Sequence, residues 1–262
     1  MPLETLLQRD FSVRCEWGLP AVRALAPACD AVVIVDVLSF STCVDIATAR
    51  GATIHPFRFA DERAAAFARA NDALLAGDNA LGLSLRPASL LGIEAGTRLV
   101  LPSPNGSLLS TETGAVPTIA GCLRNARAVA ECAAAIGERI LIVPAGERWP
   151  DGSLRPALED LCGAGAIIHH LPAARTRSPD ALAAAAVFAR ARETLFATLS
   201  ACASGRWKAA RDQNRDVDLA AALDVSPCAP VLRDGAFVGG QGSGEPSEGG
   251  RTDEGAKAAT AS

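Results

Sequence analysis

The chain has 262 residues, 49% of them hydrophobic, which is enough to build one large domain or two lobes that share a sheet. Its formal net charge is −4 and no basic stripe with interleaved aromatic residues occurs, which argues against a nucleic-acid partner. No apolar run is long enough to cross a bilayer, so we expect no membrane span and no membrane partner.

Cysteine usage and the N-terminal segment both favour a cytoplasmic protein. The eight cysteines are scattered and form no C-x-x-C pair, which argues against a zinc site and favours reduced thiols. Residues 1–17 carry charges throughout and lack the long apolar core of a signal peptide. The sequence therefore predicts a cytoplasmic location.

In chain order, the first half of the sequence alternates short apolar runs with helical patterns. Residues 11–17 alternate with period two, which is typical of an edge strand. Residues 31–35 are five apolar residues, four of them β-branched, and predict a strand buried on both faces, as in a parallel sheet covered by helices. Further strands are expected at 52–56 and 99–101, and helices at 42–50 and 61–76.

The second half continues this alternation. Strands are expected at 118–122 and 139–144, and helices at 126–136, from Pro156 past residue 168, and from 178 to about 204. Residues 230–238 predict two extended pieces around an Asp-Gly turn.

The predicted fold is a three-layer α/β/α arrangement with a largely parallel central sheet. We expect residues 1–238 to form this domain, as one body or as two lobes. From residue 239 onward the chain is rich in Gly, Ser and Glu without periodicity, so residues 239–262 are predicted to be a disordered tail.

Asp36 lies at the end of the buried run and is the residue around which we place the candidate site. In an open α/β sheet, ligands bind beyond the carboxyl ends of the strands. Ser39, Ser41 and Thr42 follow, and such hydroxyl residues cap helices and bind anions at a helix start. The alternative for Asp36 is that it merely caps the following helix.

Two further turns follow predicted strands. Asn105, Gly106 and Ser107 come after the strand at 99–101, in a turn whose backbone N–H groups can form an anion nest and whose glycine favours a positive φ. Gly146 comes after the strand at 139–144. A plain tight turn is the alternative for residues 105–107.

Two predicted helix starts carry polar residues that could join the same edge of the sheet. Glu159 and Asp160 lie early in a helix, where acidic side chains interact favourably with the helix dipole. Asn125 precedes the helix at 126–136, and N-capping is its alternative role.

These residues supply carboxylates, hydroxyls and backbone N–H groups, without an activated Ser–His pair or a zinc cluster. Hard oxygen ligands next to anion nests suit Mg²⁺ together with a phosphate. Phosphoryl transfer needs a protein to place the group, neutralise its oxygens and aim a nucleophile. From the residues alone we predict magnesium-dependent phosphoryl transfer or hydrolysis.

A series of short motifs runs through most of the chain. The motifs are 33–38 with the following Ser/Thr turn, 77–78, 105–107, 124–126, 144–146, 159–160 with 162–165, and 204–205 with 216–217. In these motifs, over about residues 10–238, the chain resembles the 2-phosphosulfolactate phosphatases of coenzyme M biosynthesis. The resemblance implies a three-layer α/β/α fold and Mg²⁺-dependent hydrolysis of 2-phosphosulfolactate to 3-sulfolactate and phosphate.

The resemblance also implies roles for individual residues. Asp36 would be the central carboxylate, as metal ligand or as nucleophile. Glu159 and Asp160 would complete or orient the metal shell, and Asp160 is a further catalytic candidate. The predicted substrate-binding residues are Ser39, Ser41, Thr42, Asn105, Gly106, Ser107, Asn125 and Gly146.

Two positions depart from the family pattern. The family usually has Arg where this chain has Ser39, and Gly-Glu where it has Gly77-Asp78. The first change removes a bidentate clamp for phosphate, carboxylate or sulfonate, which a hydroxyl does not replace. Candidates to compensate are Arg124, Arg148 and Arg155.

Two alternatives to the phosphatase remain. One is a non-catalytic or altered-specificity anion-binding protein on the same fold, which the Ser39 departure suggests. The other is a nucleotide-dependent enzyme such as a kinase or methyltransferase, against which the absence of a P-loop or usable dinucleotide motif argues. A second copy of the chain, in a homo-oligomer, is a further partner hypothesis.

Overall fold

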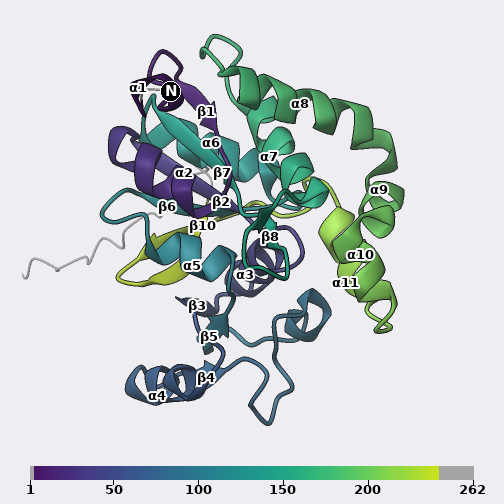
Figure 1. The fold of residues 1–262 in the computed structure, drawn as a ribbon. Helices are drawn as coiled ribbons and strands as arrows, with labels where there is room; N and C mark the ends of the chain where they lie inside the picture. The colour runs from purple at the N-terminus through teal and green to yellow at the C-terminus, as the bar shows by residue number, and fades with distance from the viewer. Residues whose placement is uncertain (1–2, 242–262) are drawn as a thin grey trace, which may run out of the picture.

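The computed structural model describes residues 3–241, and its core is a nine-stranded sheet of order β1-β7-β2-β6-β10-β11-β3-β5-β4 (Figure 1). The hairpin β10–β11 is antiparallel to its neighbours, and the strands on either side of it pair in parallel. The predicted mostly parallel sheet is therefore confirmed. The strands are β1 (Val13–Cys15), β2 (Ala31–Val35), β3 (Thr53–Phe57), β4 (Leu74–Leu75), β5 (Arg98–Pro102), β6 (Thr118–Gly121), β7 (Ile140–Pro144), β10 (Cys228–Arg233) and β11 (Ala236–Gln241).

Helices cover both faces of the sheet, which gives the predicted three layers. They are α1 (Leu3–Leu6), α2 (Gly18–Leu25), α3 (Phe40–Ala49), α4 (Glu62–Ala70), α5 (Gly106–Thr111), α6 (Ala126–Ile136), α7 (Leu158–His170), α8 (Pro179–Ala191), α9 (Leu195–Ala201), α10 (Ala203–Ala209) and α11 (Asn214–Ala221). Across the described part of the chain, none of the helices is both long and apolar enough to span a membrane.

Strand β2 shows why its sequence is apolar without alternation. Val33 and Val35 point to one face, where they pack in a cluster with residues of α6 and α7. Val32 and Ile34 point to the other face, where α2 and α5 cover them. All five residues of β2 are fully buried, as expected for a central strand of a sheet covered on both sides.

Two predicted helices are shorter than expected. The helix predicted at 61–76 ends at Ala70, because Asp72 adopts a positive φ and Leu74–Leu75 then pairs with β5. The helix predicted from 178 to about 204 is divided into α8, α9 and α10. Cys202 is extended between α9 and α10, so the chain changes direction there and brings α10 to the candidate site.

The C-terminal hairpin turns at the predicted Asp-Gly pair, since Asp234 and Gly235 both have positive φ. The predicted start of the tail is wrong by three residues, because residues 239–241 belong to β11. A Cβ on Gly239 would lie 2.8 Å from the carbonyl oxygen of Thr48, so only glycine fits this close approach. The rest of the predicted tail, residues 242–262, lies outside the described residues.

Candidate active site

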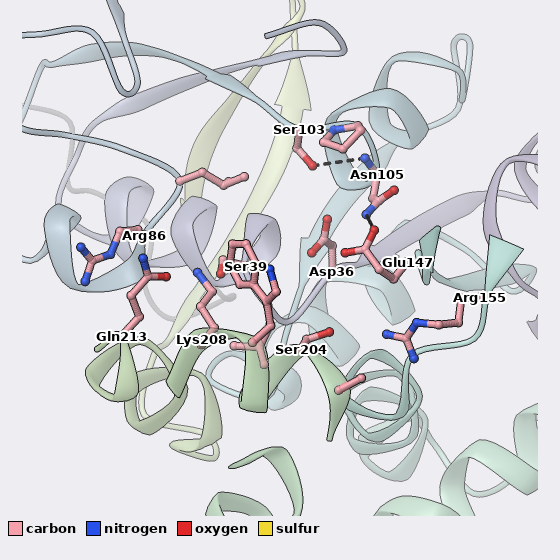
Figure 2. Close-up of a pocket in the computed structure, with 15 residues that line it drawn as sticks. Asp36, Ser39, Arg86, Ser103, Asn105, Glu147, Arg155, Ser204, Lys208 and Gln213 are labelled. Carbon is pink, nitrogen blue, oxygen red and sulfur yellow. Dashed lines mark hydrogen bonds between the residues drawn. The ribbon is translucent and has the colours of Figure 1, made fainter. Parts of the chain in front are cut away.

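A cavity of about 610 Å³ opens at the carboxyl ends of β2, β5 and β7 (Figure 2). The loops that follow these three strands line one side of it, and helix α10 with the loops around residues 86 and 213 lines the other. Its lining residues are Asp36, Leu38, Ser39, Leu85, Arg86, Ser103, Pro104, Asn105, Glu147, Arg155, Ala203, Ser204, Trp207, Lys208 and Gln213. The predicted convergence of strand-end turns on one edge of the sheet is thus observed for these three strands.

Asp36 lies in the cavity wall and is almost fully buried. Its Oδ2 accepts a hydrogen bond from the backbone N–H of Gly106 at 2.8 Å, and its Oδ1 accepts one from Phe40 at 3.3 Å. Burial, with a smaller contribution from the charges of Glu147 and Glu159, raises the pKa of this carboxyl to about 6, against the opposing effect of the two N–H donors. Asp36 therefore contacts the first residue of α3, as a helix-capping role requires. Its carboxylate also faces the cavity.

Gly106 is needed at this site for a reason other than the predicted one. Its φ is not positive, so the expectation of a left-handed turn was wrong. A Cβ at this position would lie 2.3 Å from the ring of Phe40 and 2.8 Å from Oδ2 of Asp36. The absence of a side chain lets the N–H of Gly106 reach the carboxylate.

Glu147 and Asn105 complete the acidic end of the cavity, which we define as Asp36, Asn105 and Glu147. The Nδ2 of Asn105 donates a hydrogen bond to Oε1 of Glu147 at 3.1 Å, and Figure 2 shows both side chains beside Asp36. Glu147 lies in β8 (Glu147–Arg148), which pairs with β9 (Leu154–Arg155). The sequence analysis missed Glu147, although it directly follows the Gly146 that closes a strand.

Asp160 connects two of the loops and does not line the cavity. Its Oδ1 accepts from the N–H of Val37 at 2.7 Å and its Oδ2 from that of Gly146 at 2.9 Å. Burial and the nearby charges of Asp36 and Glu159 hold the pKa of Asp160 well above its usual range. Both oxygens thus have a structural task, namely to fix the ends of β2 and β7 relative to each other.

Glu159 is also outside the cavity lining, and its buried Oε2 has no hydrogen-bond partner among residues 3–241. Within the same range, no three His, Cys, Asp or Glu side chains form a group that could hold a metal ion. The predicted metal-binding group of Asp36, Glu159 and Asp160 is therefore wrong as a preformed cluster. The reason is that Asp160 turns toward backbone donors, while Asp36 faces the cavity with Glu147.

Three predicted substrate-binding hydroxyls serve the backbone instead. All three are fully buried away from the cavity. Ser41 donates to the carbonyl oxygen of residue 34, Thr42 to that of residue 37 and Ser107 to that of residue 101. They hold the strand-end loops in place, so their assignment as substrate contacts was wrong.

Asn125 and Gly146 also lie outside the cavity lining. The side chain of Asn125 accepts from the N–H of Cys122 and donates to the carbonyl oxygen of Ala120, so it fixes the loop before α6. Gly146 acts through its N–H on Asp160. Of the predicted substrate-binding residues, Ser39 and Asn105 line the cavity, and Gly106 supports Asp36 from behind.

The three candidate replacement arginines lie in different places. Arg124 forms an ion pair with the buried Asp45 at 2.9 Å and does not line the cavity. Arg148 does not line the cavity, and its guanidinium donates to the backbone carbonyl oxygens of Pro104 and Gly152. Arg155 does line the cavity, and it lies opposite Glu147 in the β8–β9 pair.

The opposite end of the cavity carries cations that the sequence analysis missed. We call Arg86 and Lys208 the basic end. Nε of Arg86 lies 3.2 Å and Nζ of Lys208 3.5 Å from the same oxygen, Oδ2 of the fully buried Asp216. The only sequence signal for this basic end was the place of Asp216 in a family motif. Lys208 itself gave no signal, because it lies in a charged segment that is typical of a solvated helix.

A sequence model of the family described as 2-phosphosulpholactate phosphatase matches residues 23–235, most of the chain. The chain belongs to this family. No protein among the curated sequences matches it. The match includes every residue that lines the cavity, so the cavity belongs to the part of the chain that defines this phosphatase family.

The acidic end offers a donor set that suits a hard divalent cation. Mg²⁺ is commonly held in phosphoryl-transfer sites by one or two carboxylates, with substrate phosphate oxygens and waters completing its shell. The carboxylates of Asp36 and Glu147 both face the cavity, with the amide of Asn105 beside them (Figure 2). Asp36 and Glu147 are therefore the residues that would hold such a cation.

Proposed function

We propose that this chain is a Mg²⁺-dependent phosphatase that converts 2-phosphosulfolactate to 3-sulfolactate and phosphate. Family membership supports phosphate ester hydrolysis. The cavity supports a small, multiply anionic substrate, because it carries carboxylates at one end and two cations at the other.

The observation that carries the proposal is the separation of charge within one cavity. Asp36 and Glu147 suit a cation and hence the phosphoryl group bound to it, whereas Arg86 and Lys208 suit an acidic group elsewhere on the same molecule. A phosphoester that bears a carboxylate and a sulfonate matches this division of charge.

The residues of the acidic end have distinct tasks. When bound, Mg²⁺ would neutralise charge on the phosphoryl oxygens. Asp36 and Glu147 would hold it, and the two backbone N–H groups on Asp36 fix that carboxylate in a single orientation. Asn105 orients Glu147 through their hydrogen bond, and Arg155, which lines the cavity from β9, would bind a phosphoryl oxygen.

Phosphate release from 2-phosphosulfolactate tests the proposal. We expect turnover with Mg²⁺, loss of turnover with EDTA, and recovery when Mg²⁺ is restored. Glu147→Gln should raise the Mg²⁺ concentration needed for half-maximal rate by about 10-fold or more. Glu112→Gln is the matched control, because Glu112 binds surface arginines away from the cavity.

The non-catalytic alternative makes a different prediction. Binding of 3-sulfolactate or phosphate in equilibrium dialysis, without metal-stimulated phosphate release, would identify an anion-binding protein on the phosphatase fold. That result would overturn the proposed reaction.

A further inference from the structure

Lys208 is an unusual residue in this chain because it is one of only two lysines and it is buried. Its side chain is 7% exposed and lines the cavity from helix α10. A buried ammonium group is costly unless it is paired and hydrogen-bonded. The place of Lys208 therefore calls for a partner inside the cavity.

The protein supplies that partner only in part. Nζ of Lys208 lies 3.5 Å from Oδ2 of Asp216, beyond the usual range for an N–H···O hydrogen bond. The same oxygen accepts a hydrogen bond from Nε of Arg86 at 3.2 Å. The other oxygen of Asp216, Oδ1, accepts one from the backbone N–H of Ala88 at 3.0 Å. Two cations thus share one carboxylate, and the basic end keeps one positive charge in excess.

Ser39 supplies a second, independent observation. It lines the same cavity and is 5% exposed, yet its Oγ has no hydrogen-bond partner in the described part of the chain. Figure 2 shows Ser39 on the side of the cavity that faces Lys208, with Asp36 beyond it. A buried hydroxyl without a partner is a free donor for a bound group.

From this arrangement we infer that Lys208 and Ser39 together bind the acidic group of the substrate that is not transferred, a carboxylate or a sulfonate. The inference rests on the proposed function and makes Lys208 a specificity-determining residue. The ammonium supplies charge and the hydroxyl supplies a further hydrogen bond. Both groups approach from the side opposite Glu147, so the phosphoryl group stays at the acidic end.

The test compares phosphoesters that differ in their second acidic group. The substrates are 2-phosphosulfolactate, phosphoglycolate with only a carboxylate, the phosphate ester of 2-hydroxyethanesulfonate with only a sulfonate, and ethyl phosphate with neither. Lys208→Met should raise KM for 2-phosphosulfolactate on the order of 10- to 100-fold, as expected for one lost charge-assisted hydrogen bond. If Lys208→Met also raises KM for only one of phosphoglycolate and the sulfonate ester, that substrate identifies the bound group. The increase in KM for ethyl phosphate should be far smaller.

Three further variants sharpen this comparison. Lys208→Arg keeps the charge and should recover part of the lost affinity. Ser39→Ala should act in the same direction as Lys208→Met, by about 10-fold or less. Arg206→Met removes an exposed charge from the same helix outside the cavity, so it serves as the matched control. Thermal melts establish that each variant is folded.

Two outcomes separate this inference from the proposed function. An equal loss on all four substrates, or no loss on any, would overturn the role of Lys208 while the phosphatase stands. If the wild-type protein releases no phosphate, calorimetric titration with 3-sulfolactate decides: weaker binding to Lys208→Met than to wild type supports the subsite, and equal or absent binding overturns it.

Discussion

At the acidic end of the cavity the central carboxylate, Asp36, is positioned by backbone N–H groups, whereas at the basic end the two cations are positioned by another side chain. Asp36 accepts from Phe40 and Gly106, and Asp160 behind it accepts from two further backbone donors. Arg86 and Lys208 instead depend on the single carboxylate of Asp216. The acidic end is therefore part of the sheet edge, while the basic end is a contact between distant segments.

Under the proposed function, this difference would separate chemistry from specificity. The backbone donors at strand ends fix the carboxylate that, in the proposed reaction, every phosphoester would meet. The ion pairs at the basic end can change without disturbing the sheet, because they come from α10, α11 and the loop at residue 86. Substitutions at the two ends should accordingly have different consequences.

The largest effect on turnover is expected at the acidic end. Asp36→Asn should reduce phosphate release on the order of 10³-fold or more, because it removes the charge that faces the cavity. The amide can accept from only one of the two N–H groups, so its fold should be checked by circular dichroism. Near-wild-type turnover by a folded Asp36→Asn protein would show that the carboxylate has no part in the reaction.

The largest effect on stability is expected at the basic end. Asp216→Ala should lower the free energy of unfolding by about 3–5 kcal/mol, because it leaves the buried Lys208 without its carboxylate. Asp218→Ala on the same helix removes an exposed pair with Arg215 and should cost under about 1 kcal/mol. Urea unfolding measures both, and similar losses in the two variants would contradict the role given to Asp216.

The pKa of Asp36 predicts a pH dependence that belongs to the acidic end. Its folded-state pKa of about 6 lies above the ordinary value of 3.8, so the folded protein binds a proton more tightly than the unfolded chain does. Asp36 should therefore lower the free energy of unfolding as pH rises from about 4 to 6, by at most about 3 kcal/mol.

Thermal melts of wild type and Asp36→Asn without metal check this sign. Relative to wild type, the variant should gain stability between pH 4.5 and pH 7.5. A stability difference that is the same at both pH values would place the pKa of Asp36 near its ordinary value. In the same pH range, protonation of Asp36 should also weaken Mg²⁺ binding.

A smaller effect tests the close approach that positions Asp36. Gly106→Ala should destabilise the protein by about 1–3 kcal/mol, because the new methyl group would overlap the buried ring of Phe40. Gly92→Ala is the matched control, since a Cβ there meets no atom within 4 Å. Equal melting temperatures for the two variants would show that the loop after β5 yields easily.

Some of the site could be predicted because the sheet fixes where strands end. The run at 31–35 is apolar and largely β-branched, which favours a strand buried on both faces, so Asp36 was expected to emerge at the edge of the sheet. The same reasoning placed residues 105–107 and 146 nearby. The roles of individual polar side chains within these turns did not follow from their position.

Ser41, Thr42 and Ser107 show why those roles escaped the sequence analysis. A hydroxyl next to a strand end can bind a ligand or satisfy a buried carbonyl group, and the two uses have the same sequence pattern. Here the carbonyl groups of residues 34, 37 and 101 are the partners. Only the packed loops reveal which use applies.

The sequence by itself determined the parallel sheet, its layers of helices, the family and the acid at the end of β2, because burial patterns and short motifs are local. The tertiary structure alone decided that Glu147 is the second carboxylate of the cavity and that Asp160 supports the loops. It also decided that Lys208 faces inward. These assignments depend on which segments meet, because Lys208 in α10 shares the cavity with residues of the loops after β2, β5 and β7, which are far from it in the sequence.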